Sequence, residues 1–362
     1  MEMNAAQKTS STVVDVARKA GVSVGTVSRV LNGYSSISPE NVDRVQRAIE
    51  ELGYRKSRSA DPLINRRRAA RASTGNIGLI YAEMDGDWAN HPLVAAYSVG
   101  VEKACQEKGF HALIEFSNND GSLPRCVREN KVDALLIKAT RTLPPYLGGL
   151  SKELPVVCVG FNKPTVNMQQ VASDDHGAGW LVADYLWSLG HRRIGIVCPD
   201  LGHPMLLARY QGYEAFLRSQ HRFDPALCIL AEPTHSIEHP EYEPPDMSQA
   251  VEKLLAVPGD PITAIITAND WIAYGLYPAL AAAGKSVPED ISVVGFDNYV
   301  TVCATLRPQL TSYAVPFGDV AYVSTLKAID RIQNQNSLWD HSLHLVRGEI
   351  IERSSVRPLT EK

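Results

Sequence analysis

The sequence predicts an α/β protein in which a small three-helix head precedes a larger body of parallel sheets wrapped by helices. The chain has 362 residues, about twice a typical domain length. Apolar residues recur at helical spacing in three segments between residues 12 and 54. From residue 77 onward, short apolar runs such as IGLIYA and ISVVGF alternate with amphipathic helical segments, a pattern typical of sheets covered by helices. We therefore divide the chain into a head (1–54), a basic hinge (55–76) and a body (77–362).

The composition is that of a folded globular protein, with 44% hydrophobic and 21% charged residues. No stretch reaches the roughly 20 apolar residues of a membrane span, and the N-terminus lacks the apolar core of a signal peptide. We therefore expect a cytoplasmic protein without membrane contact. The six cysteines show neither a CxxC pair nor Cys/His metal spacing, so no disulfide framework, metal site or cofactor is expected.

Charge is distributed unevenly along the chain. Residues 1–76 hold 13 Lys and Arg against 7 Asp and Glu, a net charge of +6. Because the whole chain carries −4, the remaining residues carry −10. Neutralising DNA phosphates needs cations only where the DNA is contacted. A basic head on an acidic body therefore indicates a nucleic-acid-binding domain joined to a domain with another task.

The segment TVVDVARKAGVSVGTVSRVLNG, residues 12–33, predicts two short helices joined by a tight turn. Thr12 starts the first helix, Gly21 supplies the left-handed residue of the turn, and Ser23 caps the second helix. A third helix is expected to be capped by Ser38, to have proline at its first position and to end near residue 53. The three helices share one small core, so the segment is interpreted as a helix-turn-helix.

In a helix-turn-helix the second helix enters the major groove of DNA with its N-terminal residues at the base edges. This geometry assigns base contacts to Val24, Gly25 and Arg29, of which Arg29 has the donor pattern suited to guanine. Phosphate contacts, which position the head without specifying sequence, are expected from Ser23, Thr26, Ser28 and Asn32. The alternative is a three-helix unit with no DNA role, which explains the helical pattern but not the basic excess.

The segments DVARKAGVSVGTVSRVLNG and ISPENVDRVQRAIEELGY resemble the DNA-binding head of the LacI/GalR family of bacterial transcription repressors. The resemblance implies a homodimer that binds pseudopalindromic double-stranded operator DNA and a small-molecule effector, a sugar or sugar derivative. It also implies a body of two doubly wound lobes, similar to periplasmic sugar-binding proteins, with the effector between them. The chain is then expected to cross between the lobes near residues 162–170, near 298–315 and again near the C-terminus.

The hinge departs from the family pattern Tyr-x-Pro-Asn-x-x-Ala-Arg-x-Leu. Tyr54 and Leu63 fit the pattern and are expected at the DNA, but Pro62 inside a helix would cost about 3 kcal/mol. One interpretation is a shifted helix that is capped by Asp61 and has Pro62 at its first position, and the other is a flexible basic linker. In the shifted helix, phosphates beside the minor groove would be bound by Arg66, Arg67, Arg68 and Arg71.

Polar residues that follow strands of the body match effector-binding positions of the family. Arg209 lies in ARYQGY, Asn269 opens NDWIAYG, and Asp297 follows ISVVGF. Because ligands of doubly wound folds lie beyond the carboxyl ends of strands, we expect these side chains to converge on a polyhydroxylated ligand. A helix-capping or surface role is the alternative for each of them. The resemblance adds Asp174 near the cleft, Leu93 in the first effector loop, and Trp88 and Trp271 as aromatic faces for a sugar ring, with an ordinary core position as the alternative for Trp271.

Three other functions are alternatives to a DNA-binding repressor. The sequence has no GxSxG, Walker, HExxH or strand-linked GxGxxG motif, so an enzyme is not expected. A sugar-binding transport protein would share the body fold but would have no use for the helix-turn-helix. A transcription activator would use the same head and cleft, and the sequence leaves that alternative open.

Overall fold

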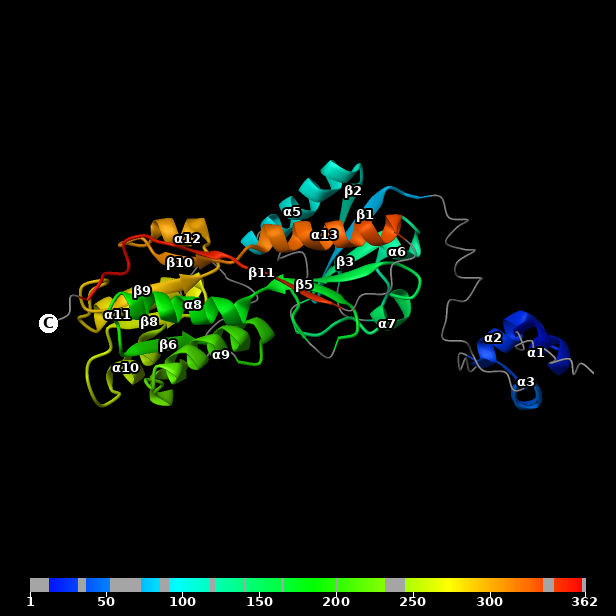
Figure 1. Ribbon diagram of the computed structural model, residues 1–362, viewed down its shortest axis with the longest axis horizontal. Coiled ribbons are helices and arrows are strands. Elements are labelled where there is room, and N and C mark those ends of the chain that lie inside the picture. The colour runs from blue at the N-terminus through cyan, green and yellow to red at the C-terminus, as the bar shows by residue number, and fades with distance from the viewer. Residues whose placement is uncertain are drawn as a thin grey trace, which may run out of the picture. The chain divides into compact units, whose positions relative to one another are not determined.

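The computed structural model describes residues 13–31, 37–52, 73–84, 91–117, 121–139, 141–163, 166–199, 201–231, 245–334 and 342–359. The chain divides into two compact units, residues 1–72 and 73–362 (Figure 1). Each unit is described by itself. The proposed limits of the hinge stay a prediction, because residues 53–72 lie outside the described ranges.

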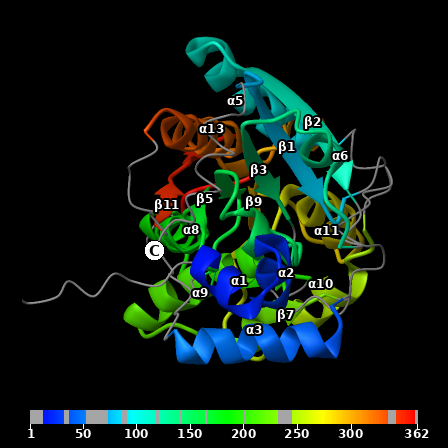
Figure 2. The same cartoon turned by 90° about the vertical axis from the view of Figure 1, so that its right-hand side faces the viewer.

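The first unit is a three-helix bundle, which confirms the predicted helix-turn-helix (Figure 2). Its helices are α1 (Val13–Ala20), α2 (Val24–Leu31) and α3 (Pro39–Glu51). They enclose one small core made of Val16, Ala17, Ala20, Val27, Val45 and Ala48. Ser38 is the N-cap residue of α3, as predicted. The Asn41 amide donates to the Ser38 carbonyl oxygen (3.0 Å), and the Ser38 hydroxyl makes no capping bond.

The second unit contains two six-stranded sheets, and each sheet forms the centre of one lobe. In the first lobe the strand order is β11-β5-β4-β3-β1-β2, and all of these strands are parallel. The strands are β1 (Asn76–Ala82), β2 (His111–Ser117), β3 (Ala134–Lys138), β4 (Val156–Val159), β5 (Gln169–Ser173) and β11 (Leu343–Val346). Helices α5 (Pro92–Lys108) and α13 (Phe317–Gln333) pack together on this sheet, and the short helices α6 (Arg125–Arg128) and α7 (Leu147–Leu150) belong to a second apolar cluster on it.

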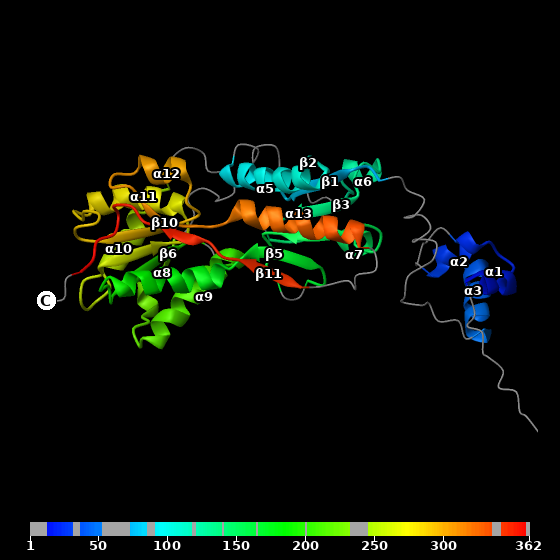
Figure 3. The same ribbon diagram turned by 45° about the horizontal axis from the view of Figure 1, so that its top comes forward.

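The second lobe has the strand order β12-β10-β9-β8-β6-β7, with β12 antiparallel to β10. Its strands are β6 (Ile194–Cys198), β7 (Cys228–Leu230), β8 (Ala264–Thr267), β9 (Ser292–Phe296), β10 (Thr311–Ala314) and β12 (Glu349–Ile351). Helices α8 (Asp175–Ser188) and α9 (Pro204–Ser219) lie on one side of this sheet, and α10 (Ser248–Leu255) and α11 (Asp270–Ala282) lie on the other (Figure 3). A 3-10 turn, Pro225–Leu227, and helix α12 (Val300–Thr305) complete the lobe.

Both sheets are doubly wound, which confirms the predicted two-lobed α/β fold. In the first sheet the chain winds outward from β1 to β2 and then returns to β3 on the other side of β1. In the second sheet β6, β7 and β8 are related in the same way. The strand order thus reverses between β1 and β3 and between β6 and β8, and ligands of such folds bind beyond the carboxyl ends of the strands at this reversal.

The chain crosses between the lobes three times, and one predicted crossing is misplaced. The first crossing follows β5 and not residues 162–170, because residues 169–173 form a fifth strand of the first sheet. The second lies between β10 and α13, at the end of the predicted 298–315 range. The third joins β11 to β12, near the C-terminus as predicted. Among the described residues no helix is both long and apolar enough to span a membrane.

Candidate functional site

The turn between α1 and α2 is closed by backbone hydrogen bonds around a left-handed glycine. Gly21 has φ +65°, and its amide donates to the Arg18 carbonyl oxygen (3.4 Å). The Val22 amide donates to the Ala17 carbonyl oxygen (3.1 Å). This pair of bonds is a standard helix ending, and it requires a residue that tolerates positive φ. The turn thereby fixes the direction in which α2 leaves α1.

The start of α2 presents its polar groups to solvent. Ser23 Oγ accepts a hydrogen bond from the Thr26 amide (3.1 Å), which confirms the predicted cap, and lies 2.9 Å from Thr26 Oγ1. Gly25 and Arg29 are exposed and four residues apart, so they share one face of the helix. Val24 is partly buried against the head core. The exposed face therefore offers a guanidinium and hydroxyl groups beside a position without a side chain.

The other predicted DNA contacts fall outside what the structure describes. For Ser28 only the backbone position in α2 is described. The shifted hinge helix, together with Asn32, Tyr54, Leu63, Arg66, Arg67 and Arg68, lies in ranges that are not described. These assignments stay predictions.

In the second unit Arg209 is the centre of a buried ion network. From α9 its Nε donates to Asp175 Oδ1 (2.9 Å), and its Nη2 donates to Asp297 Oδ1 (2.9 Å). Nη1 donates to the Ala268 carbonyl oxygen (2.8 Å), at the end of β8. Burial by itself lowers the pKa of Arg209, but the two carboxylates raise it above its ordinary value. Arg209 and Asp297, two of the three side chains expected to converge, are therefore in direct contact.

Two glycines position Arg209 by letting α8 and α9 touch. A Cβ at Gly212 would collide with the His176 carbonyl oxygen of α8, and a Cβ at Gly179 would collide with the Arg209 carbonyl oxygen of α9. The close crossing brings the first turn of α8, which carries Asp175, next to Arg209. The Arg-x-x-Gly spacing of the sequence thus has a packing reason as well as a binding one.

Asp297 and Asp270 are held side by side at the carboxyl end of the second sheet. Asp297 has φ +93°, a conformation that non-glycine residues rarely adopt and that is common at functional sites. Burial raises the pKa of Asp297, and Arg209 limits the rise. Asp270 accepts hydrogen bonds from the Ser312 hydroxyl and the Tyr299 amide (2.7 Å each). Burial and the nearby Asp297 raise the pKa of Asp270 to about 7.

The remaining predicted effector residues differ in their burial and in their contacts. Asn269 is buried and caps α11, accepting a hydrogen bond from the Ile272 amide (3.0 Å). Trp271 is partly buried and meets Tyr274 edge to face, and its buried Nε1 makes no hydrogen bond with any described residue. Leu93 packs into the hydrophobic core. Trp88 lies outside the described residues.

Asp174 lies at the first crossing between the lobes. Asp174 caps α8, because its Oδ1 accepts a hydrogen bond from the Gly177 amide (2.9 Å). Its Oδ2 lies 3.0 Å from Arg347 Nε. Arg347 belongs to the third crossing, between β11 and β12. The two crossing segments are thus joined by an ion pair.

The first lobe contributes two polar groups that were not predicted as site residues, the buried Lys138 and the half-buried His91. Lys138 ends β3, and its Nζ lies 5.7 Å from the ring centroid of Tyr97 of α5. His91 caps α5 and meets Tyr299 of the second lobe edge to face, with ring centroids 5.6 Å apart. The signal for Lys138 was present: it is the charged last residue of the otherwise apolar strand ALLIK.

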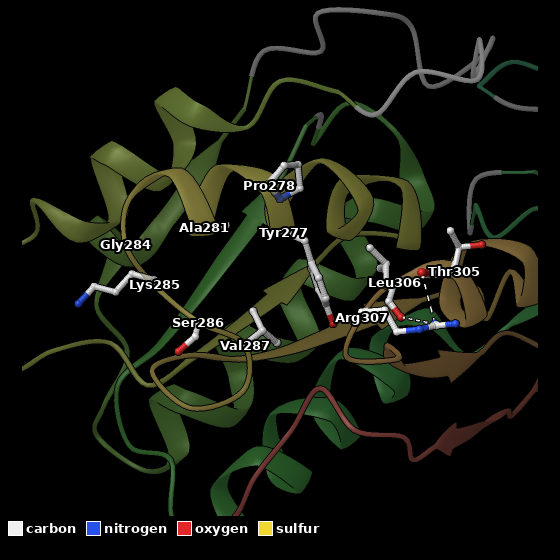
Figure 4. A pocket seen from close by; sticks show the side chains of 10 residues that line it. All are labelled: Tyr277, Pro278, Ala281, Gly284, Lys285, Ser286, Val287, Thr305, Leu306 and Arg307. Atoms are coloured by element: carbon white, nitrogen blue, oxygen red, sulfur yellow. Dashed lines mark hydrogen bonds between the residues drawn. The ribbon is translucent and has the colours of Figure 1, made fainter.

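A shallow pocket of about 660 Å³ lies elsewhere on the second lobe (Figure 4). Its lining includes Tyr277, Pro278 and Ala281 from the C-terminal half of α11, together with Thr305 at the end of α12 and the following Leu306 and Arg307. Asn269 caps the opposite end of α11, which at 13 residues is roughly 20 Å long. The pocket is therefore distinct from the Arg209 network.

Comparisons with known proteins match both units. The model of bacterial regulatory proteins of the lacI family matches residues 12–57, and that of the periplasmic binding protein-like domain matches residues 183–356. The ribose operon repressor of Haemophilus influenzae is 27% identical over 330 residues, 90% of this chain and 93% of that protein. The complex of the transcriptional regulator CelR with cellobiose has a TM-score of 0.65 at 26% identity, covering 95% of this chain and 99% of that one.

A LacI family transcriptional regulator from Enterococcus faecium, solved with bound ribose, has a TM-score of 0.61 at 25% identity. It covers 79% of this chain and 100% of its own. The relatives described here are named as repressors or transcription regulators and not as enzymes. The chain thus joins a helix-turn-helix domain of the lacI family of bacterial regulatory proteins to a periplasmic binding protein-like domain, and the relatives that match it along most of its length are LacI-type regulators.

Proposed function

We propose that the protein is a transcription repressor that binds operator DNA through α2 and whose operator affinity is controlled by a small effector, a sugar or sugar derivative, bound between the lobes. The observation that carries the proposal is the combination, in one chain, of an exposed recognition helix and a buried ion network at the carboxyl ends of two doubly wound sheets. The names of the relatives support it: one is a ribose operon repressor, and two solved relatives hold cellobiose or ribose.

The head supplies the DNA contacts in this proposal. Gly25 and Arg29 face the bases, while the Ser23 and Thr26 hydroxyl groups face phosphates. Helix α2 has eight residues and is about 12 Å long, about the rise of three or four base pairs. One head therefore reads only half of a site, and a homodimer on a pseudopalindromic operator reads the whole. Since the proposed target is bacterial DNA, we also propose that the protein works in the cytoplasm.

The body supplies the control. Arg209 and Asp297 offer a donor and an acceptor to sugar hydroxyl groups, and Asn269 and Trp271 lie at the start of the neighbouring helix α11. An effector shifts an equilibrium only if it contacts one arrangement of the lobes better than another. It must therefore also contact the first lobe, whose surface meets the second lobe where His91 contacts Tyr299.

The DNA half of the proposal is tested by selecting binding sites from a random library of double-stranded DNA with the full chain. We expect a palindromic site, and Arg29→Ala should lose about 1–3 kcal/mol of discrimination at one base pair in each half. Arg47→Ala is the matched control, since it removes the same charge from an exposed position on α3. Failure to enrich a palindrome, or the same uniform loss of affinity in both variants, contradicts the proposal.

A further inference from the structure

Lys138 lies where the fold is expected to bind a ligand in the first lobe. It is the last residue of β3 and the register partner of Tyr81 in β1. The sheet order reverses between these two strands, so their carboxyl ends flank the binding crevice of a doubly wound fold. The Lys138 side chain is nevertheless buried, with 2% of its surface exposed.

The ammonium group has few partners in this position. Its Nζ donates to the Ala139 carbonyl oxygen (3.2 Å) and faces the ring of Tyr97. A Cβ at Gly160, which follows β4, would collide with the Tyr97 hydroxyl and lie 3.4 Å from Lys138 Nζ. The missing side chain at Gly160 thus leaves space for both groups. Of the three N–H donors of an ammonium, one has a hydrogen-bond acceptor among the described residues.

The carboxylate that attracts Lys138 is already bonded to other groups. Asp175 attracts Lys138 electrostatically, but its carboxylate accepts from Arg209 Nε (2.9 Å) and from the Ser173 hydroxyl (2.6 Å). Asp297 is likewise bonded to Arg209. No carboxylate among the described residues forms an ion pair with Lys138 within 4.0 Å. A buried charge without a hydrogen-bonded counterion is strongly unfavourable, so this position favours a partner brought by a ligand.

The neighbouring groups leave the cation available at neutral pH. Burial lowers the pKa of Lys138 to about 8, so the amine is still mostly protonated at pH 7. Burial and Lys138 lower the pKa of His91 to about 4, so this imidazole is neutral and adds no second cation. Lys138 is thus a buried cation at this edge of the first sheet, and no carboxylate of the described residues is bonded to it.

We propose that Lys138 binds an anionic group of the effector, so that the effector is an acidic sugar, carrying a carboxylate or a phosphate, and not a neutral one. The inference rests on the proposed effector site. In this arrangement the hydroxyl groups of the effector form hydrogen bonds with Arg209 and Asp297 of the second lobe. The anionic group of the effector forms an ion pair with Lys138 of the first lobe. An ion pair of this kind, made only when both lobes contact the ligand, is also a means of favouring one arrangement of the lobes.

The test compares matched sugars by calorimetry on the full chain: galactose, galacturonate and galactose 6-phosphate, and the corresponding glucose series. We expect one acidic member to bind at least about tenfold more tightly than its neutral parent, and the carboxylate and phosphate arms identify which anion is recognised. Lys138→Met should abolish this preference. Lys131→Met is the matched control and should keep it, because Lys131 is exposed and precedes the same strand. Equal binding of neutral and acidic members, or an acid preference that survives in Lys138→Met, overturns the proposal.

A ligand-free measurement separates recognition from a structural role. A lysine buried for ligand binding destabilises the empty protein, so the thermal midpoint of Lys138→Met should be higher than that of the wild type. A lower midpoint would show that Lys138 holds the lobes together and would overturn the proposal. Operator binding by the wild type and Lys131→Met is measured in parallel. Its absence would contradict the proposed function and would leave the anion preference standing as a separate result.

Discussion

Replacing Arg209 by methionine removes the central cation of the buried network while keeping a long side chain in its place. The substitution leaves Asp175, Asp297 and the Ala268 carbonyl oxygen without bonds of 2.9, 2.9 and 2.8 Å. The side chains of Arg209, Asp175 and Asp297 are 3%, 2% and 9% exposed, so water cannot readily replace the lost partner.

Breaking a buried ion pair by removing one partner costs about 3–5 kcal/mol, and we expect Arg209→Met to lower the free energy of unfolding by that amount. The control is Arg218→Met on the same helix. Arg218 pairs with Glu214 at the surface, where the two side chains are 61% and 26% exposed. Solvent screens such a pair, so its loss should change the free energy of unfolding by less than about 1 kcal/mol.

Urea unfolding followed by tryptophan fluorescence measures this difference in the full chain. All five tryptophans lie beyond residue 72, so the signal reports the second unit alone. The difference in free energy of unfolding between the wild type and Arg209→Met should become smaller at lower pH. Burial already raises the pKa of Asp297, and without Arg209 nothing limits the rise, so protonation relieves the unpaired charge. A difference equal to that of Arg218→Met, or one independent of pH, would refute the network as described.

Two further predictions concern packing and pH. Gly212→Ala places a methyl group against the His176 carbonyl oxygen and should lower the free energy of unfolding by about 1–3 kcal/mol. Gly148→Ala is the control and should leave the free energy of unfolding unchanged, because nothing lies within 4 Å of a Cβ added at Gly148. Urea titration measures both variants. Because the pKa of Asp270 rises from 3.8 to about 7 on folding, the folded chain binds more protons in that window. The free energy of unfolding should therefore fall as pH rises through it, and equal slopes in wild type and Asp270→Asn contradict this.

Local features of the fold could be predicted from the sequence because neighbouring residues determine them. Gly21 and Ser23 close the turn and start α2 through contacts within a few residues. Strands such as β1 and β9 are continuous apolar runs. Strand β5 was missed because its sequence, QQVAS, is polar although all five residues are buried. The buried amide of Gln170 is satisfied by hydrogen bonds to the backbone of Lys163 and Val166 across a turn. The spacing of apolar residues in the sequence does not reveal such bonds.

The site was harder to predict, because its contacts join distant parts of the chain. Arg209 bonds to Asp175 across 34 residues and to Asp297 across 88. The family pattern pointed to Arg209 and Asp297, but the partner role of Asp175 depends on the close crossing of α8 and α9. Lys138 was not predicted as a site residue, since its burial follows from packing and not from local sequence. The arginines at 66–68 stay a prediction of hinge–DNA contact.

The coupling between the head and the crevice is tested most directly by two titrations of the wild-type chain. One measures the affinity for the selected palindromic DNA with and without the sugar that binds most tightly in the galactose and glucose series. The other measures the affinity for that sugar with and without the DNA. Thermodynamic linkage requires both affinities to change by the same factor, typically about 5 to 150-fold. We predict such a reciprocal change. A sugar that binds in the crevice while leaving the DNA affinity unchanged would contradict the account.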